Sequence, residues 1–440
     1  MRDIAVFLAL IGSLPFILYR PWYGILVLAW LGYMNPHRLA YGFITNMPVV
    51  LIVVLTLLTG LLFAKKEERG TIPVTRETIV LIIFIIWMFI TTNFAVYSDL
   101  AWLQWDKVWK IQVIIFLTMM LINNKERVNA LVWTIVLSLG FYGVKGGIFT
   151  LMTGGGFRVQ GPSGTFIAGN NEIGLAMLLT IPLMRYLQLS TDKKIIKTGL
   201  NVMIFLTLVS ILGTHSRGAL VGAVLMGFFL ILKSRKKFFL LILGALFIAG
   251  TLKFAPEEWF ARWDTIETYE QDKSAMGRIN AWWMAYHLAE DRVLGGGFEA
   301  FKPGMFRLYA PFPDNVHDAH SIYFEVLGEQ GFIGLTLFLT LWLFTWLSAQ
   351  QVIKEAKKDK ELTWLRDLNS MLQVCLIAYA AGGAFLGLAY FDLPYHFMAL
   401  VVISKRLLVK YKKQKKEKNR DEIKNSNQPD IEANKFKLLQ

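Results

Sequence analysis

The stretch PVVLIVVLTLLTGLLFA, residues 48–64, is followed by the basic cluster KKEER and then by IVLIIFIIWMFITTNFAV, residues 79–96. Each apolar stretch, as an α-helix rising about 1.5 Å per residue, is long enough to cross most of the hydrocarbon core of a bilayer. The alternation continues along the 440 residues, of which 55% are hydrophobic and 18% charged. Soluble domains carry about a quarter charged residues. The sequence therefore predicts an all-α polytopic integral membrane protein and excludes a soluble enzyme.

The net charge of +14 comes from 46 Lys and Arg against 32 Asp and Glu. Its placement argues against a nucleic-acid partner, because residues 405–440 alone hold 12 basic and 5 acidic residues. The remaining basic clusters lie between apolar runs, as the positive-inside rule predicts. We expect residues 405–440 to form a disordered cytoplasmic tail that is attracted to anionic membrane lipids. Residues 1–404 are then the membrane domain.

The short basic loops at 65–69, 125–127, 193–197, 233–237 and 354–360 fall at alternate connections, so we place all of them in the cytoplasm. The predicted spans are residues 48–64, 79–96, 107–122, 128–152, 167–189, 198–213, 218–232, 237–253, 332–349, 369–389 and 391–404.

The N-terminal residues 4–34 must then deliver the chain to the outer side. With a cytoplasmic N-terminus they make one net crossing, broken near Pro15 and Pro21, and the protein has about 12 transmembrane helices. Two short crossings with an external N-terminus give 13 instead. The sequence leaves both alternatives open.

Three connections fall on the outer face: residues 153–165, the turn at 214–218 and a long loop at 254–331. The long loop has 13 acidic and 6 basic residues, unlike the cytoplasmic loops, and we expect a helix at 275–291 within it. Trp282, Trp283 and Tyr286 are expected on one side of that helix. A membrane protein that places nearly 80 residues in one external loop usually uses it for recognition or chemistry. We therefore interpret 254–331 as a periplasmic catalytic loop.

Arg158, Arg217 and Arg278 lie on the outer side, where the positive-inside rule disfavours them. Any one of them could simply extend to the lipid headgroups. Three together favour an anion site, because the arginine fork matches two phosphate oxygens at once.

Further polar residues near the outer ends of spans are candidate ligand contacts: Lys145, Asn171, Glu172 and His215. For Lys145, packing against Glu172 is an equally good interpretation. The Gly154-Gly155-Gly156 run lets backbone approach a ligand closely, but no Gly-Lys-Ser/Thr follows, so it is not a Walker loop.

The sequence His317-Asp318-Ala319-His320 ends the long loop. Histidine is the natural general base near neutral pH, and a carboxylate orients it. Asp318, Glu325 and Glu329 are all candidates for that carboxylate. The alternatives are two polar surface residues or a zinc pair, and for zinc no HExxH or cysteine set supplies the remaining ligands. We predict that no metal is bound.

Taken in order, these motifs resemble the O-antigen ligase and O-antigen polymerase superfamily over about residues 1–405. The motifs are Arg158 before Asn170-Asn171, Ser216-Arg217-Gly218, Gly277-Arg278-Ile279-Asn280-Ala281-Trp282, Leu294-Gly295-Gly296-Gly297, and His320-Ser321-Ile322-Tyr323 followed by Glu329-Gln330-Gly331. The N-terminal stretch through Asn35-Pro36-His37-Arg38 is similar to the O-glycosylation ligases associated with exosortase systems. Two departures are the second histidine, His317, and Asn170-Asn171 in place of Asn-Pro-Asn.

The resemblance implies a glycosyltransferase of the bacterial inner membrane whose active site faces the periplasm. It would transfer a glycan from undecaprenyl diphosphate to a sugar hydroxyl of lipid A-core, without a cofactor. By motif position His320 would be the catalytic base, and Arg217 and Arg278 would hold the diphosphate, with Arg158 as a third ligand. His317 and Glu329 would contact substrate. Because no Asp-x-Asp pair appears in the outer segments, we predict a metal-independent reaction that inverts the anomeric centre.

Other functions fit parts of this pattern. A polymerase would use the same donor with a growing glycan as acceptor, and a protein O-glycosylation ligase would use a protein hydroxyl. A transporter of polyprenyl-linked glycans is the alternative from another class. Transporters place polar groups and broken helices at the bilayer midplane, whereas the candidate residues here lie toward the outer ends of the spans.

Overall fold

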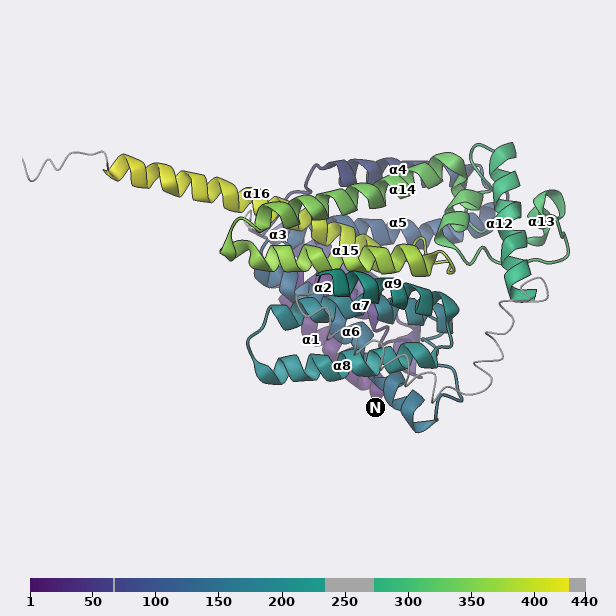
Figure 1. The fold of residues 1–440 in the computed structure, drawn as a ribbon, viewed down its shortest axis with the longest axis horizontal. Helices are drawn as coiled ribbons and strands as arrows, with labels where there is room; N and C mark the ends of the chain where they lie inside the picture. Colours follow the sequence, from purple (N-terminus) through teal and green to yellow (C-terminus); the bar gives the residue numbers. More distant parts are fainter. Residues whose placement is uncertain (66–67, 234–272, 427–440) are drawn as a thin grey trace, which may run out of the picture.

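The computed structural model describes residues 1–65, 68–233 and 273–426. These residues form α-helices and short 3-10 turns with no β-strand among them, which confirms the all-α class. Most of the helices run along one axis as a bundle (Figure 1). The predicted span at 237–253, most of the loop before residue 273 and residues 427–440 lie outside the described residues. The expectation of a disordered tail is wrong for residues 405–426, which continue the last helix, Asp392–Ser426.

The first six helices are α1 Arg2–Tyr19, α2 Trp22–Tyr33, α3 Val49–Phe63, α4 Arg76–Asn93, α5 Ser98–Leu121 and α6 Lys125–Met152. After them come α7 Asn170–Leu189, α8 Lys194–Gly213, α9 Arg217–Lys233, α12 Lys273–Asp291, α13 Pro303–Tyr309, α14 Ile322–Ala356, α15 Thr363–Gly383 and α16 Asp392–Ser426. In the part of the chain that is described, six helices are long and apolar enough to cross a membrane: α1, α4, α6, α7, α8 and α14. The multi-pass membrane class is therefore confirmed, while the total of about 12 spans stays a prediction.

The N-terminal helices α1 and α3 run in the same direction. At their beginnings, the Asp3 carboxylate accepts a hydrogen bond from the Gly42 N–H at 2.9 Å. At their ends, a Cβ atom on Gly60 would lie 2.8 Å from the Ile17 carbonyl oxygen. The start of α1 therefore lies at the same end of the bundle as Gly42, which the topology places outside.

Helix α2 returns antiparallel between them, since Gly24 near its start packs against Leu57 near the end of α3. The chain breaks at Arg20 and Pro21, whereas Pro15 lies inside α1. This arrangement corresponds to the alternative with two short crossings and an external N-terminus.

The boundary between the long loop and the next span is a kink inside α14. Gly331 has φ 66° and ψ −175°, a conformation that favours glycine. A Cβ atom there would lie 2.3 Å from the Val293 carbonyl oxygen, so the loop packs directly on the kink. Backbone hydrogen bonds from Gly296 to Gly328 (2.8 Å) and from Gly297 to Glu329 (2.9 Å) complete the junction. The Leu294–Gly297 motif thus fixes the loop to α14.

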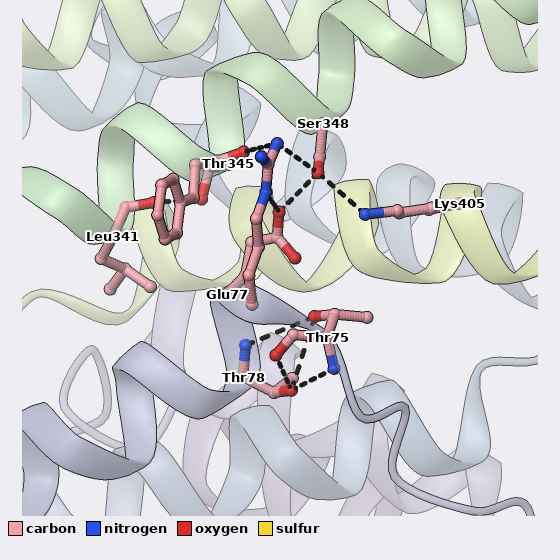
Figure 2. Close-up of polar contacts among 9 residues, drawn as sticks. Thr75, Glu77, Thr78, Leu341, Thr345, Ser348 and Lys405 are labelled. Atoms are coloured by element: carbon pink, nitrogen blue, oxygen red, sulfur yellow. Dashed lines mark hydrogen bonds and ion pairs between the residues drawn. The ribbon is translucent and has the colours of Figure 1, made fainter.

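A buried ionic network joins α4, α14 and α16 at the end of the bundle that carries the basic loops (Figure 2). The fully buried Glu77 carboxylate accepts from the Ser348 hydroxyl at 2.5 Å and contacts Arg76 Nε at 3.1 Å. The Lys405 ammonium donates to the same hydroxyl at 3.3 Å. Because a buried charge is costly unless it is paired, this network favours one alignment of the three helices.

Candidate functional site

Helix α12 runs across one end of the bundle instead of along it (Figure 1). Asn280 on this helix is buried, and its side-chain amide donates to the carbonyl oxygens of Phe312 (2.8 Å) and Asn315 (2.9 Å). Its side-chain oxygen accepts from the Phe312 N–H at 2.9 Å. Because the buried amide is satisfied on both sides, Asn280 fastens the segment that leads to the two histidines.

Two further contacts hold the histidine segment against α12. The indole N–H of Trp282 donates to the Ala319 carbonyl oxygen at 2.8 Å, and the same ring stacks on Phe324 at 4.9 Å between centroids. Gly277 lies directly under the other histidine, since a Cβ atom there would be 2.3 Å from Cδ2 of His317. Helix α12 therefore acts as the scaffold for residues 312–320.

The aromatic side chains of α12 divide into two groups. Trp282 is turned toward the histidine segment, while Trp283 (49% exposed) and Tyr286 (38% exposed) remain at the surface. The two groups differ in exposure and not in helix face, because Trp282 stacks on Phe324 and Tyr286 contacts Phe332, both on α14, as expected for residues four apart.

His320 is half-buried and has a left-handed backbone, with φ 41°. This conformation is uncommon for a residue with a side chain and concentrates at functional sites. Burial and the nearby Arg278 charge lower the pKa of His320, and Asp318 opposes them. An imidazole with a lowered pKa is neutral at physiological pH, which is the form that can accept a proton.

Asp318 is the one of the three candidate carboxylates that acts electrostatically on His320. The other two are engaged elsewhere: the Glu325 carboxylate accepts from the Ala389 N–H at 3.1 Å, and Glu329 from the Glu299 N–H at 2.8 Å. Glu329 is buried and helps to hold the loop on the kink of α14. A role for Glu329 in contacting substrate stays a prediction.

Glu172 at the start of α7 connects the two sides of the site. Its carboxylate lies in electrostatic range of both Asp318 and Arg278, which are more than 100 residues later in the chain. It also folds back over Gly169, where a Cβ atom would lie 2.0 Å from its Oε2. The first turn of α7 is therefore beside the histidine segment.

The Gly-rich segment and the turn before α9 are bound to each other. The Val159 N–H donates to the Gly213 carbonyl oxygen at 2.8 Å, and His215 Nε2 lies 3.0 Å from the Gly155 carbonyl oxygen. His215 also has a left-handed backbone, with φ 54°. These contacts bring together two outer segments that are more than 50 residues apart in the sequence.

The side chains of Arg158 and Arg217 are both exposed on this paired segment. Asn170, the first residue of α7, attaches it to the rest of the site by donating to the Thr214 carbonyl oxygen at 2.8 Å. The sequence prediction chose Asn171, but the hydrogen bond comes from its neighbour. Asn171 itself is half-buried in the first turn of α7.

The end of α15 lies between the starts of α9 and α14. A Cβ atom on Gly218 would be 3.1 Å from Phe385 Cβ, and one on Gly383 would be 2.7 Å from Ile322 Cδ1. Arg217 directly precedes the first of these contacts, and His320 lies two residues before the second. The two elements that carry them therefore flank the same short segment.

Lys145 does not join this cluster. It is exposed on α6, and no ion pair with Glu172 is recorded between these two described residues. The packing interpretation therefore has no support in the structure, and a role for Lys145 in binding stays a prediction.

Three residues with a role in the site were missed in the sequence. Asn280 and Gly277 build the scaffold, and both belong to the motif around Arg278, whose polar and glycine positions were the available signal. Lys302 is the third: its ammonium lies 2.7 Å from Glu299 and within electrostatic range of Asp318, and the Glu299 hydrogen bond raises the pKa of Lys302. Nothing in its local sequence distinguishes it from other loop lysines.

Residues 202–339, which contain the turn before α9, helix α12 and the histidine segment, match the O-antigen ligase family. Residues 1–192 match a family of unknown function, DUF5935. A search of the curated proteins found no match. The first match confirms the resemblance to the O-antigen ligase superfamily and supports a membrane enzyme of the O-antigen ligase or polymerase type.

Proposed function

We propose that the protein is a glycosyltransferase that moves a glycan from undecaprenyl diphosphate to a sugar hydroxyl of lipid A-core at the periplasmic face of the inner membrane. The observation that carries the proposal is the environment of His320. This residue has a left-handed backbone, and burial and the charge of Arg278 lower its pKa, inside the region that matches the O-antigen ligase family. The two residues would combine a proton acceptor with a cation that binds phosphate.

In the proposed reaction, His320 takes the proton of the acceptor hydroxyl while the hydroxyl oxygen attacks the anomeric carbon of the donor. The bond between that carbon and the diphosphate oxygen breaks, and the lipid diphosphate leaves with the bonding electrons. A positioned base of this kind contributes about 10²–10⁴ in rate. Because attack comes opposite the leaving group, the anomeric centre is inverted, which NMR of the product would test.

Arg217 and Arg278, with Arg158 as a third ligand, would hold the diphosphate. A cation aimed at charge that develops in the transition state contributes about 2.7–4 kcal/mol, by analogy with oxyanion sites. The lipid diphosphate is already an activated leaving group, so the proposed reaction needs neither nucleotide nor metal. Asp318 would orient His320, since it is the carboxylate whose charge acts on this imidazole.

The test is transfer by the purified protein in detergent, with an undecaprenyl-diphosphate glycan as donor and lipid A-core as acceptor. EDTA is present and nucleotide is omitted. We expect one discrete product from the wild type, and none from His320→Asn. His317→Ala is the matched histidine variant and should keep part of the rate, since His317 packs on Gly277.

The acceptor is tested in the same assay. A glycan ladder without lipid A-core product would make the protein a polymerase, and labelled protein would make it a protein O-glycosylation ligase; both outcomes keep the chemistry and reject the acceptor. No product with any acceptor would reject glycosyl transfer and favour transport.

A further inference from the structure

A second polar site lies at the end of the bundle opposite α12, where the connections after α3 and α5 meet α16. It is a cavity of about 470 Å³ that opens to the surface. No acidic residue is among its described lining residues. Four cationic side chains line it: Arg69, Arg127, Arg406 and Lys410. The volume is in the range of small-ligand pockets.

Backbone carbonyl groups hold the arginines in place. The Arg406 guanidinium donates to the carbonyl oxygens of Thr71 at 3.0 Å and Ile122 at 2.8 Å. Arg127 donates to the Leu121 carbonyl oxygen at 2.8 Å. A carbonyl orients a guanidinium without neutralising it, so these contacts position positive charge around the cavity.

The positive charge in the cavity is only partly compensated. Glu68 forms an ion pair with Arg127, and this is the one carboxylate that the described residues pair with any of the four cations. The Arg127 guanidinium also lies 5.3 Å from the centroid of the Trp22 ring, which covers one side of it. The cavity therefore keeps a net positive charge that favours an anion.

The start of α6 adds to this preference. Asn124 is the N-cap residue of this 28-residue helix, and Asn123 and Asn124 both line the cavity. A helix N-terminus carries partial positive charge and favours phosphate nearby. The Asn124 side chain accepts from the backbone N–H of Arg127 at 2.9 Å and so caps this helix end.

We propose that this cavity binds the phosphate of an anionic membrane lipid. A phosphate offers the oxygen pairs that arginine forks match. The cavity lies where the connections after α3 and α5 meet α16, and an apolar residue, Leu407, shares its lining with the cations. Basic pockets between membrane helices are known to take such headgroups. The proposal is independent of the glycosyl-transfer chemistry at the other end of the bundle.

The occupied cavity would connect distant parts of the chain, because Arg406 and Lys410 lie on α16 and Arg69 and Arg127 lie in the first third of the sequence. A bound phosphate would relieve repulsion among these cations. We therefore expect the anionic lipid to stabilise the folded protein by mass action.

The test uses the full-length protein in detergent and follows the thermal midpoint by tryptophan fluorescence. Short-chain phosphatidylglycerol, short-chain phosphatidylcholine and inorganic phosphate are added at equal concentration and constant ionic strength. We expect phosphatidylglycerol to raise the midpoint by a few degrees and the other two to have little effect. Native mass spectrometry should show one phosphatidylglycerol retained per chain.

The variant Arg406→Gln/Lys410→Gln should lose both the shift and the retained lipid. Lys410→Gln alone keeps every hydrogen bond recorded among the described residues, so a reduced shift there cannot come from a lost fold contact. The matched control is Lys413→Gln/Lys416→Gln, which removes two exposed charges from the same helix outside the cavity.

Equal shifts from both phospholipids, or an unchanged shift in the double variant, would overturn the proposal. Loss of the shift in the control variant would show that the lipid is attracted nonspecifically by the basic helix, and this outcome would also reject binding in the cavity. A shift from inorganic phosphate as large as that from phosphatidylglycerol would reject the lipid in favour of a soluble anion.

Discussion

The two ends of the bundle use arginine in different ways. At the end with the basic loops, Arg127 and Arg406 donate to backbone carbonyl oxygens, and Arg76 contacts the buried Glu77. At the end with α12, Arg292 also donates to carbonyl oxygens, those of Gly295 and Phe94, while Arg158 is exposed on the Gly-rich segment and Arg217 is exposed at the first position of α9. The difference is that the first end has an arginine in a buried carboxylate network, while the second has exposed arginines on two paired outer segments.

The backbone differs in the same way between the two ends. The residues other than glycine with positive φ, in the described part of the chain, all lie toward the α12 end: Asn35, His215, Glu299 and His320. Such conformations persist only where the surroundings impose them, and they concentrate at functional sites. We therefore expect substitutions at the two ends to affect different measurements: stability at the end with the basic loops and reaction rate at the end with α12.

The largest expected effect is on the rate of His320→Asn. Asparagine tolerates a left-handed backbone, so the variant keeps the local conformation and loses only the base. We expect the single-turnover rate of glycan transfer to fall by about 10²–10⁴. Size-exclusion chromatography checks that the variant is folded. A rate close to that of the wild type would show that another group accepts the proton.

Arg217→Lys is expected to reduce the rate next most strongly. Lysine keeps the charge but cannot make two parallel hydrogen bonds to a phosphate, so the rate should fall by about tenfold or more. The matched control is Arg307→Lys on α13, an exposed arginine of the long outer loop that lies outside the described cluster. If both variants lose the same activity, Arg217 has no specific role in binding diphosphate.

A smaller effect is a shift of the pH profile. In the wild type, kcat/KM should fall as the pH is lowered, and the midpoint of this acid limb should lie below the ordinary histidine pKa of about 6.5. The reason is that burial and Arg278 lower the pKa of His320. A general base fails as pH falls through its pKa. Asp318→Asn removes the charge that raises this pKa, so its acid limb should move to still lower pH.

Arg278→Gln should move the acid limb the opposite way, to higher pH, in whatever activity it retains. If the acid limbs of both variants move in the same direction, the acid limb does not report the protonation of His320. The opposite signs distinguish an effect on His320 from a general loss of activity.

The smallest effect on rate is expected at the other end of the bundle. Glu77→Gln removes the buried carboxylate that Arg76 and Ser348 share, so the thermal midpoint should fall by several degrees while kcat stays unchanged. Asp106→Asn is the control, because Asp106 forms an exposed pair with Lys110 and such pairs contribute little. A large drop in kcat for Glu77→Gln would contradict the division between the two ends.

Much of the fold could be predicted from local sequence. The apolar run at 128–152 became α6 at Lys125–Met152, and the run at 198–213 became α8 at Lys194–Gly213. The end of the long loop was also predicted, since Gly331 is the kink within α14. These features follow from hydrophobicity and glycine geometry, which act within a single segment.

The site could be predicted only in part. The Arg278 and His320 motifs were recognised, and the charge of Arg278 acts on His320 in the folded chain. The bond from Asn170 to the Thr214 carbonyl oxygen, the contact of Trp282 with Ala319 and the exposed position of Lys145 depended on which way a side chain points against another segment. A helix start shifts by a residue or two with its capping contacts, and such a shift turns each side chain to a new neighbour.

The sequence by itself determined the membrane class, the helices and the family resemblance, because these depend on apolar run length and on motif order. Only the tertiary structure decided that Asp318 is the carboxylate acting on His320, that α12 fastens the histidine segment through Asn280, and that α1 runs parallel to α3. The physical reason is that electrostatics and packing depend on distances through space. Residues far apart in the chain acquire those distances only when the helices pack together.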